Sequence, residues 1–300
     1  MDSRSIDLTF PFLDEEELYK SHPSRYAGHL IGHEGPGSIL VYLKKKGWAH
    51  SLNAGATPVA SGSAFFQVSI KLTEDGLGEN AICRAFSLLT HRVEHYEEIV
   101  KSVFHYINLL KDTPVQEWIV KELQGTASVD FKFMQKSPAS SFTSRQAAVM
   151  QRPFPRDWLL SASLLIREYD PATISRSLDF LYPENFRLSV VSRTCPRGEF
   201  DKVEGWYKTE YRVEKIPEAF LQQLRSTTGK GKGAGELSAE LHLPHKNEFI
   251  PTNFDVQKKE VEAPQKIPAL IKNTDLVRIW YKKDDTFWVP KANVFITLRK

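Results

Sequence analysis

Two histidines and a glutamate near the end of the first third of the chain have the spacing of a zinc-hydrolase motif. His91, Glu94 and His95 match the pattern His-x-x-Glu-His. On a helix, His91 and His95 would share a face and ligate zinc, with Glu94 beside them as the general base. A pattern this short also arises by coincidence. A standalone zinc hydrolase is therefore one hypothesis, and the surrounding elements decide whether it is supported.

Other residue types that carry chemistry lack a supporting pattern. Ser140, Ser141 and Ser144 lie in a polar stretch without the glycines of a nucleophile elbow. The glycine-rich run Gly229–Gly235 lacks the spacing of a phosphate-binding loop, so a flexible loop is the simpler interpretation. Neither segment indicates a second catalytic centre.

The composition is that of a globular chain with little net charge. The sequence has 300 residues, is 41% hydrophobic and 26% charged, and has a formal net charge of +3. This charge is too small to favour nucleic acid as a partner, and no stretch is long and apolar enough to cross a bilayer. Two cysteines, Cys83 and Cys195, cannot form a disulfide framework and suggest a reducing compartment. We expect a cytoplasmic chain that binds neither nucleic acid nor membrane.

Hydrophobic periodicity predicts a mixture of strands and helices. Alternation favours strands over residues 5–11, 64–72, 187–191, 277–281 and 292–298. Helical spacing favours helices from residue 39 to a stop at Gly47, and over 99–110, 155–166, 171–181 and 217–226. Strands separated by long helical stretches predict an α+β fold, with an antiparallel sheet covered by helices.

The C-terminal fifth of the sequence has a different character. Four prolines and little periodicity make residues 242–271 an extended linker. Strand patterns resume after it and the chain stops soon afterwards. The sequence therefore predicts a first domain over 1–241, an interdomain linker over 242–271, and the truncated start of another domain over 272–300.

Two long runs carry a resemblance to a known family. The first is Tyr26–Ser38, with the sequence Tyr-Ala-Gly-His-Leu-Ile-Gly-His-Glu-Gly-Pro-Gly-Ser, followed by Gly47-Trp48. The second is Pro244–Phe254, with the sequence Pro-His-Lys-Asn-Glu-Phe-Ile-Pro-Thr-Asn-Phe. Together they resemble the second domain and the interdomain linker of the insulin-degrading-enzyme type of zinc metalloprotease, peptidase family M16. Pro268–Ile271 and Trp288–Ala292 resemble the approach to its third domain.

The resemblance implies a non-catalytic role for this chain. The resemblance implies an enzyme of four domains, which close into a chamber around a peptide and hold zinc in domain one. The implied partners are peptide substrates and the missing catalytic and C-terminal domains, and no cofactor is expected in this chain itself. The domain-two exosite carries over onto the following positions: His29, Leu30, Ile31, Gly32, His33, Glu34, Gly35, Leu52, Asn53, Ala54, Gly55 and Ala56. The second element departs from the family at Ala54, where a glycine is common, and at Asn53 and Ala56.

Backbone capture is the physical logic of such an exosite. An extended peptide adds as a strand to an exposed sheet edge, where main-chain groups give affinity without demanding a sequence. Gly28, Gly32 and Gly35 let a foreign backbone approach closely, and Glu34 with nearby carbonyls could hold the peptide's N-terminal ammonium. Alternatively, this run is only a turn at the start of a helix, with structural histidines.

The zinc-type motif falls at the end of a segment without a counterpart in the resemblance. Similarity runs up to Leu77 and resumes near His95, which leaves residues 78–93 as an insertion. Gly78-Glu79 can be encoded by a splice-donor sequence and Leu89-Thr90 across a branch sequence, so one hypothesis is a translated, unspliced intron. The motif is then a coincidence. A catalytically inactive peptide-binding module is the other alternative to the exosite domain.

Overall fold

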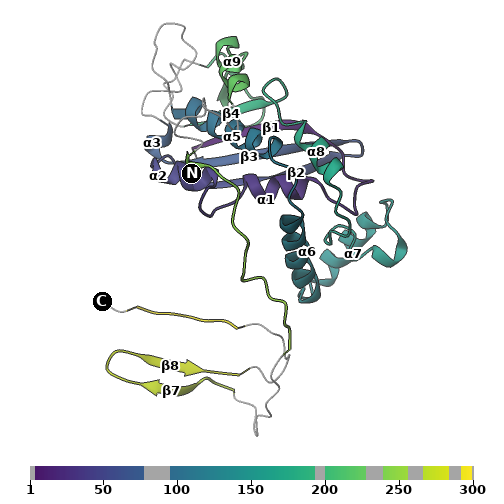
Figure 1. Cartoon of the computed structure of the whole chain (residues 1–300), viewed down its shortest axis with the longest axis vertical. Helices are drawn as coiled ribbons and strands as arrows, with labels where there is room; N and C mark the ends of the chain where they lie inside the picture. Colours follow the sequence, from purple (N-terminus) through teal and green to yellow (C-terminus); the bar gives the residue numbers. More distant parts are fainter. Residues whose placement is uncertain are drawn as a thin grey trace.

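A single four-stranded antiparallel sheet organises the main body of the protein (Figure 1). The structure is a computed structural model and describes residues 4–77, 95–192, 200–227, 239–255, 266–283 and 292–298. The sheet has the order β2-β3-β1-β4. Its strands are β1 (Ser5–Phe12), β2 (Ala49–Ala60), β3 (Ser63–Leu72) and β4 (Arg187–Val191). The predicted α+β fold with an antiparallel sheet is confirmed.

Alternating side chains place one face of the sheet on the core. Along β1, Ile6, Leu8 and Phe10 are completely buried, whereas Asp7 and Thr9 between them are partly exposed. β1 pairs with both β3 and β4, so its apolar side chains lie in the middle of the buried face. The ring of Phe104, on a core helix, lies 6.0 Å from that of Phe10. Hydrophobic burial against this helix therefore fixes the register of the central strands.

Helices cover the buried face of the sheet and one of its edges. Helix α5 (His95–Lys111) lies in the core and contacts α2 (Ile39–Lys45), α8 (Pro171–Leu178) and α9 (Glu218–Ser226). Helix α1 (Ser24–Ile31) packs along the edge strand β2. The remaining helical elements are α3 (Glu74–Leu77), α6 (Glu117–Lys132), α7 (Ala139–Val149) and the 3-10 turn η1 (Arg156–Trp158). Figure 1 shows α6 and α7 projecting on the side of the sheet where α1 lies.

Two predicted elements are wrong. The helix predicted over 155–166 is only the turn η1 followed by irregular chain. In this segment the backbone carbonyl oxygens of Ser163 and Leu164 accept hydrogen bonds from the side chain of Arg25, which lies outside the segment. The strand predicted over 292–298 is not formed in the described structure, where these residues are exposed and have no assigned strand partner.

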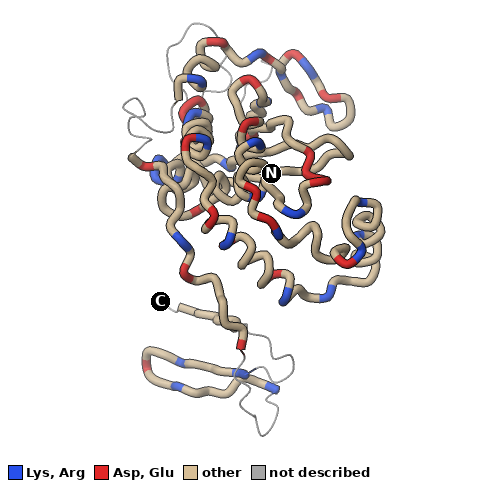
Figure 2. The backbone as a smooth tube through the Cα atoms, turned by 45° about the vertical axis from the view of Figure 1, so that its right-hand side comes forward, with Lys and Arg blue, Asp and Glu red and all other residues tan. Residues whose placement is uncertain are grey.

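Short hairpins and an extended segment complete the described chain. Strands β5 (Lys202–Val203) and β6 (Glu210–Tyr211) pair with each other, as do β7 (Ala269–Asn273) and β8 (Arg278–Tyr281). The β7-β8 hairpin is exposed along its whole length and lies apart from the main body in Figure 1. Among the described helices, none has the length and apolar character needed to cross a membrane. Figure 2 shows basic and acidic residues interspersed along the tube.

Candidate functional site

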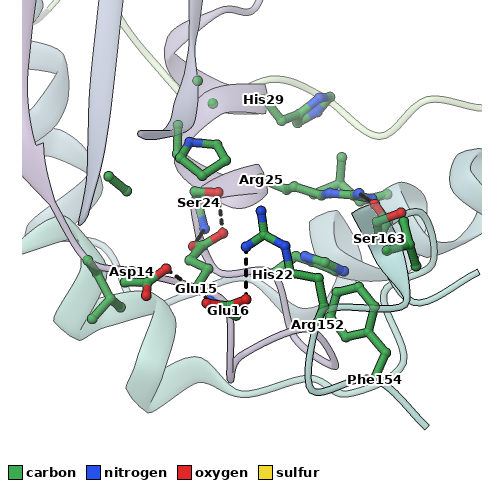
Figure 3. Close-up of a pocket in the computed structure, with 18 of the residues that line it drawn as sticks. Asp14, Glu15, Glu16, His22, Ser24, Arg25, His29, Arg152, Phe154 and Ser163 are labelled. Carbon is green, nitrogen blue, oxygen red and sulfur yellow. Dashed lines mark hydrogen bonds and ion pairs between the residues drawn. The ribbon is translucent and has the colours of Figure 1, made fainter. Parts of the chain in front are cut away.

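A cavity of about 810 Å³ lies beside the edge strand β2. Its walls come from β2, from α1 and the loop before it, and from α6, α7 and the chain that follows α7. The lining residues are Leu13, Asp14, Glu15, Glu16, His22, Ser24, Arg25, Gly28, His29, Ala54, Gly55, Ala56, Pro58, Ala64, Leu123, Arg145, Ala148, Val149, Arg152, Phe154 and Ser163. Figure 3 shows Phe154 and Arg152 on one side and His29 at the opposite end.

The backbone of β2 presents its unpaired edge toward α1 and this cavity. A Cβ built on Gly28 would lie 3.1 Å from the carbonyl oxygen of Ala54, and one built on Gly32 would lie 3.5 Å from its nitrogen. Both polar groups of Ala54 therefore point outward, away from β3. Because backbone direction alternates along a strand, Ala56 and Pro58 point the same way. A proline at position 58 agrees with this direction, since its nitrogen has no hydrogen to donate to β3.

Helix α1 closes the edge of β2 at Ala54 and leaves it open beyond. The glycines at 28 and 32 let the helix backbone approach Ala54 so closely that a strand has no room between them. Ala56 and Pro58 lie further along the strand, and both line the cavity. The free edge is therefore a short ladder with a closed end.

The start of α1 is anchored by a half-buried carboxylate. Glu15 accepts hydrogen bonds from the backbone nitrogen of Ser24, at 2.5 Å, and from its hydroxyl, at 2.7 Å. Burial raises the pKa of Glu15, and the hydrogen bonds from Ser24 oppose this effect. Glu16, the next residue, pairs with Arg152 at 2.9 Å and so connects the loop before α1 to the chain after α7 (Figure 3).

The histidines near the cavity are held toward their neutral form. Burial, with Arg25 nearby, lowers the pKa of His22 to about 4, and its Nε2 lies 2.8 Å from the carbonyl oxygen of Ala162. Burial also lowers the pKa of His29, and the neighbouring His33 lowers it further. The pKa of His33 is lowered mainly by burial. At neutral pH these three histidine rings therefore add little positive charge near the cavity.

The structure brings part of the predicted exosite into the cavity. His29, Ala54, Gly55 and Ala56 line it. Gly32 lies against the backbone of Ala54, and the segment His33, Glu34 and Gly35 follows the end of α1 without lining the cavity. Of the remaining predicted positions, Leu30 and Ile31 are fully buried, Leu52 is almost fully buried, and Asn53 is exposed. The buried three can contribute through their backbone.

Sequence reasoning missed the opposite wall of this cavity. It did not predict α7, which contributes Arg145, Ala148 and Val149, or the role of Arg152 and Phe154 after it. The spacing 145, 148, 149 and 152 is the helical repeat that would have indicated one shared face. Only Val149 in that stripe is strongly apolar, so the hydrophobic signal is weak.

The described residues do not fit a zinc ion. No group of three or more histidine, cysteine, aspartate or glutamate side chains with metal-binding geometry occurs in the parts of the chain that the structure describes. Glu94 and the segment 78–93, which includes His91, lie outside the described residues. His95 is described, and its ring lies 4.5 Å from that of Trp48. The standalone zinc hydrolase therefore gains no support from the described side chains.

Comparison with known families identifies the class of protein. Residues 1–126 match the family described as "Peptidase M16 inactive domain", and residues 131–300 match "Middle or third domain of peptidase_M16". The chain belongs to the peptidase M16 family. Both descriptions concern non-catalytic parts of such a peptidase, in agreement with the resemblance in the sequence.

Individual relatives give the same assignment. The chain is 38% identical over 291 residues to the insulin-degrading enzyme of Homo sapiens, and 36% identical over 299 residues to the A-factor-processing enzyme of Saccharomyces cerevisiae. These matches cover 97% and 99% of this chain but only 26% of each relative, so the chain spans about a quarter of their length. The crystal structure of pitrilysin has the same fold over 96% of this chain and 28% of its own, with a TM-score of 0.75 at 21% identity.

Proposed function

We propose that this chain is the substrate-anchoring, chamber-forming part of a zinc metalloendopeptidase that acts on peptides. In this role it holds one end of a peptide as an added strand on the free edge of β2. The observation that carries the proposal is the outward-facing backbone of Ala56 and Pro58, which opens into a cavity of about 810 Å³. An unpaired strand edge beside a cavity is suited to backbone capture.

The closed end of the ladder favours a chain terminus. Since α1 blocks the edge at Ala54, a pairing peptide must stop there instead of continuing past it. The depressed pKa values of His29 and His33 keep these rings neutral, and Glu34 is an exposed carboxylate just after the end of α1, outside the residues that line the cavity. These features support N-terminal anchoring.

Catalysis and zinc would come from other parts of the enzyme. The chain spans about a quarter of the relatives it matches, and one relative in Schizosaccharomyces pombe is named "Putative zinc protease mug138". The described residues hold no fitting ligand set of their own. The implied partners are thus a peptide and the catalytic and C-terminal domains. Anchoring raises the local concentration of the scissile region at that distant centre.

The variant Ala56→Pro tests strand pairing directly. It removes the outward N–H while sparing the bonds to β3, as Pro58 already does two residues further on. Ala56→Ser is the matched control, because it keeps the N–H with a similar side-chain volume. We expect Ala56→Pro to weaken binding of a fluorescently labelled decapeptide by about tenfold, the effect of losing one well-formed hydrogen bond in a desolvated site. Equal affinity of the two variants would contradict strand addition.

Acetylation of the same peptide tests the terminus. N-acetylation removes the ammonium, so we expect weaker binding to the wild-type chain. The loss should be smaller in Glu34→Gln, where the carboxylate partner is already absent. Unchanged binding of the acetylated peptide would contradict N-terminal anchoring and leave only side-on pairing.

A further inference from the structure

We propose that the cavity beyond the β2 edge is a side-chain pocket that selects peptides with a carboxylate beside an apolar side chain, and that Arg145 binds the carboxylate. The inference rests on the proposed function, because the ligand is the same peptide that pairs with β2. Continuity between the strand edge and the cavity carries the first step, since both belong to one hollow. Side chains alternate along an added strand, so every second one would point toward the cavity or away from it.

The carboxylates around the cavity already have partners. Asp14 accepts from the backbone nitrogens of Glu16, at 3.2 Å, and Gly62, at 2.8 Å. Glu15 accepts from Ser24, as described above. Glu16 accepts from Arg152 and from the hydroxyl of Ser61, both at 2.9 Å. These acidic groups stabilise the walls, and a cationic ligand would have to compete with the bonds they make.

Two of the three arginines in the lining are similarly engaged. Arg25 donates to the carbonyl oxygens of Ser163 and Leu164, each at 2.5 Å, and Arg152 pairs with Glu16. His22 is neutral at physiological pH and bound to the chain at Ala162. These groups hold the loops around the cavity in place and are not available as counter-charges.

Arg145 differs from the other cations of the lining. Its guanidinium donates to the hydroxyl of Ser137 at 3.2 Å and makes no ion pair with any residue that the structure describes. It lies on α7, one turn before Ala148 and Val149, so the charge and the apolar surface share one helix face. An arginine suits a carboxylate because its planar fork can donate two parallel hydrogen bonds.

The rest of the wall is apolar and fits a large hydrocarbon side chain. Leu13, Leu123, Val149 and Phe154 reach the cavity from four different segments of the chain. Helix α7 has no buried residue, so its cavity-facing stripe is uncovered in the described structure. An apolar peptide side chain would cover Val149 and Phe154 and place a neighbouring carboxylate at the rim near Arg145.

Charge reversal on both sides tests the proposal. The probes are decapeptides with a free N-terminus and a C-terminal fluorophore, in which positions three to six are replaced in turn by Asp, Asn or Lys beside a fixed Leu. We expect wild-type affinity to favour Asp over Lys at one of these positions by about tenfold. Arg145→Gln should remove this preference and Arg145→Glu should invert it. Arg156→Glu, which makes the same charge change on the exposed turn η1 outside the cavity, should keep the wild-type order.

The outcomes separate this inference from the anchoring function. One outcome is that binding weakens on acetylation and in Ala56→Pro, while Asp-containing and Lys-containing peptides bind equally well to every variant. This outcome would overturn the pocket and leave anchoring intact. An inversion in Arg145→Glu with no effect of Ala56→Pro would support the pocket and overturn strand addition. The same preference in Arg145→Glu as in Arg156→Glu would overturn the role of Arg145, since only overall charge would then matter.

Discussion

At the scale of single residues, the cavity depends on side chains whose charge states are set by burial. His22 is the clearest case, because it occupies a turn with a left-handed backbone, φ 43°, and bonds to Ala162 on a distant loop. Its pKa of about 4 lies below the ordinary 6.5, so the folded chain resists protonation of this ring. Burial therefore makes protonation of this ring costly, whereas its bond to Ala162 favours the protonated form and opposes that cost in part.

His22→Asn should reduce the acid sensitivity of the fold. A group whose folded pKa is depressed stabilises the fold above its unfolded pKa and loses that contribution as the pH falls toward the folded value. For His22 the window runs from 6.5 down to about 4. Between pH 7 and pH 5 we expect the wild type to lose about 2 kcal/mol more unfolding free energy than His22→Asn. Asparagine is chosen because it tolerates positive φ.

Urea denaturation at the two pH values measures this difference. The other histidines are common to both chains, so their titration cancels in the comparison. An equal loss of unfolding free energy in wild type and variant would show that His22 is not the group that resists protonation.

At the scale of elements, sequence patterns succeeded where one face of an element is buried. The alternation over 5–11 and 64–72 predicted β1 and β3, and the amphipathic run over 99–110 predicted α5, because burial imposes the period. Helix α7 has no buried residue, so no hydrophobic period marks it. The backbone part of the site came from the family resemblance, whereas its α7 wall depends on tertiary contacts that no local pattern encodes.

Gly76→Ala should destabilise the junction between α3 and β2. A Cβ at position 76 would lie 1.9 Å from the carbonyl oxygen of Trp48, an atom that also accepts from the backbone nitrogen of Thr73. Alanine usually gains up to about 1 kcal/mol over glycine in a helix. Here the clash with backbone outweighs that gain, and we expect a net loss of about 2–4 kcal/mol.

Gly205→Ala is the matched control for this prediction. Nothing lies within 4 Å of a Cβ built there, so the change should stay within about 0.5 kcal/mol of wild type. Chemical denaturation of both variants gives the comparison. A Gly76→Ala chain as stable as the Gly205→Ala chain would mean that the junction can move aside at little cost.

At the scale of the whole molecule, one core joins the two segments that match different family descriptions. Strand β4 pairs with β1, and Ile174, Leu178 and Leu224 belong to the same buried cluster as Phe10. The cluster reaches Leu241, which is 3% exposed, beyond the first part of the chain. The predicted boundaries at 241 and 271 remain predictions, and the packing indicates that residues near 241 belong to the body on which they lie.

Two truncations of the chain distinguish the core from its extension. Ending the chain after Asp255 removes the β7-β8 hairpin, whose residues are all exposed, so the unfolding temperature should stay within about 2 °C of the full chain. Ending it after Thr227 also removes buried Leu241, the ion pair of Lys45 with Glu240, and the hydrogen bond from His242 to the carbonyl of Gly37. Losing a buried leucine costs about 2–5 kcal/mol. The unfolding temperature, measured by circular dichroism, should therefore fall by at least about 5 °C. Equal unfolding temperatures for the two truncated chains would place residues 239–255 outside the cooperative core, because the hairpin and the segment before it would then contribute equally little.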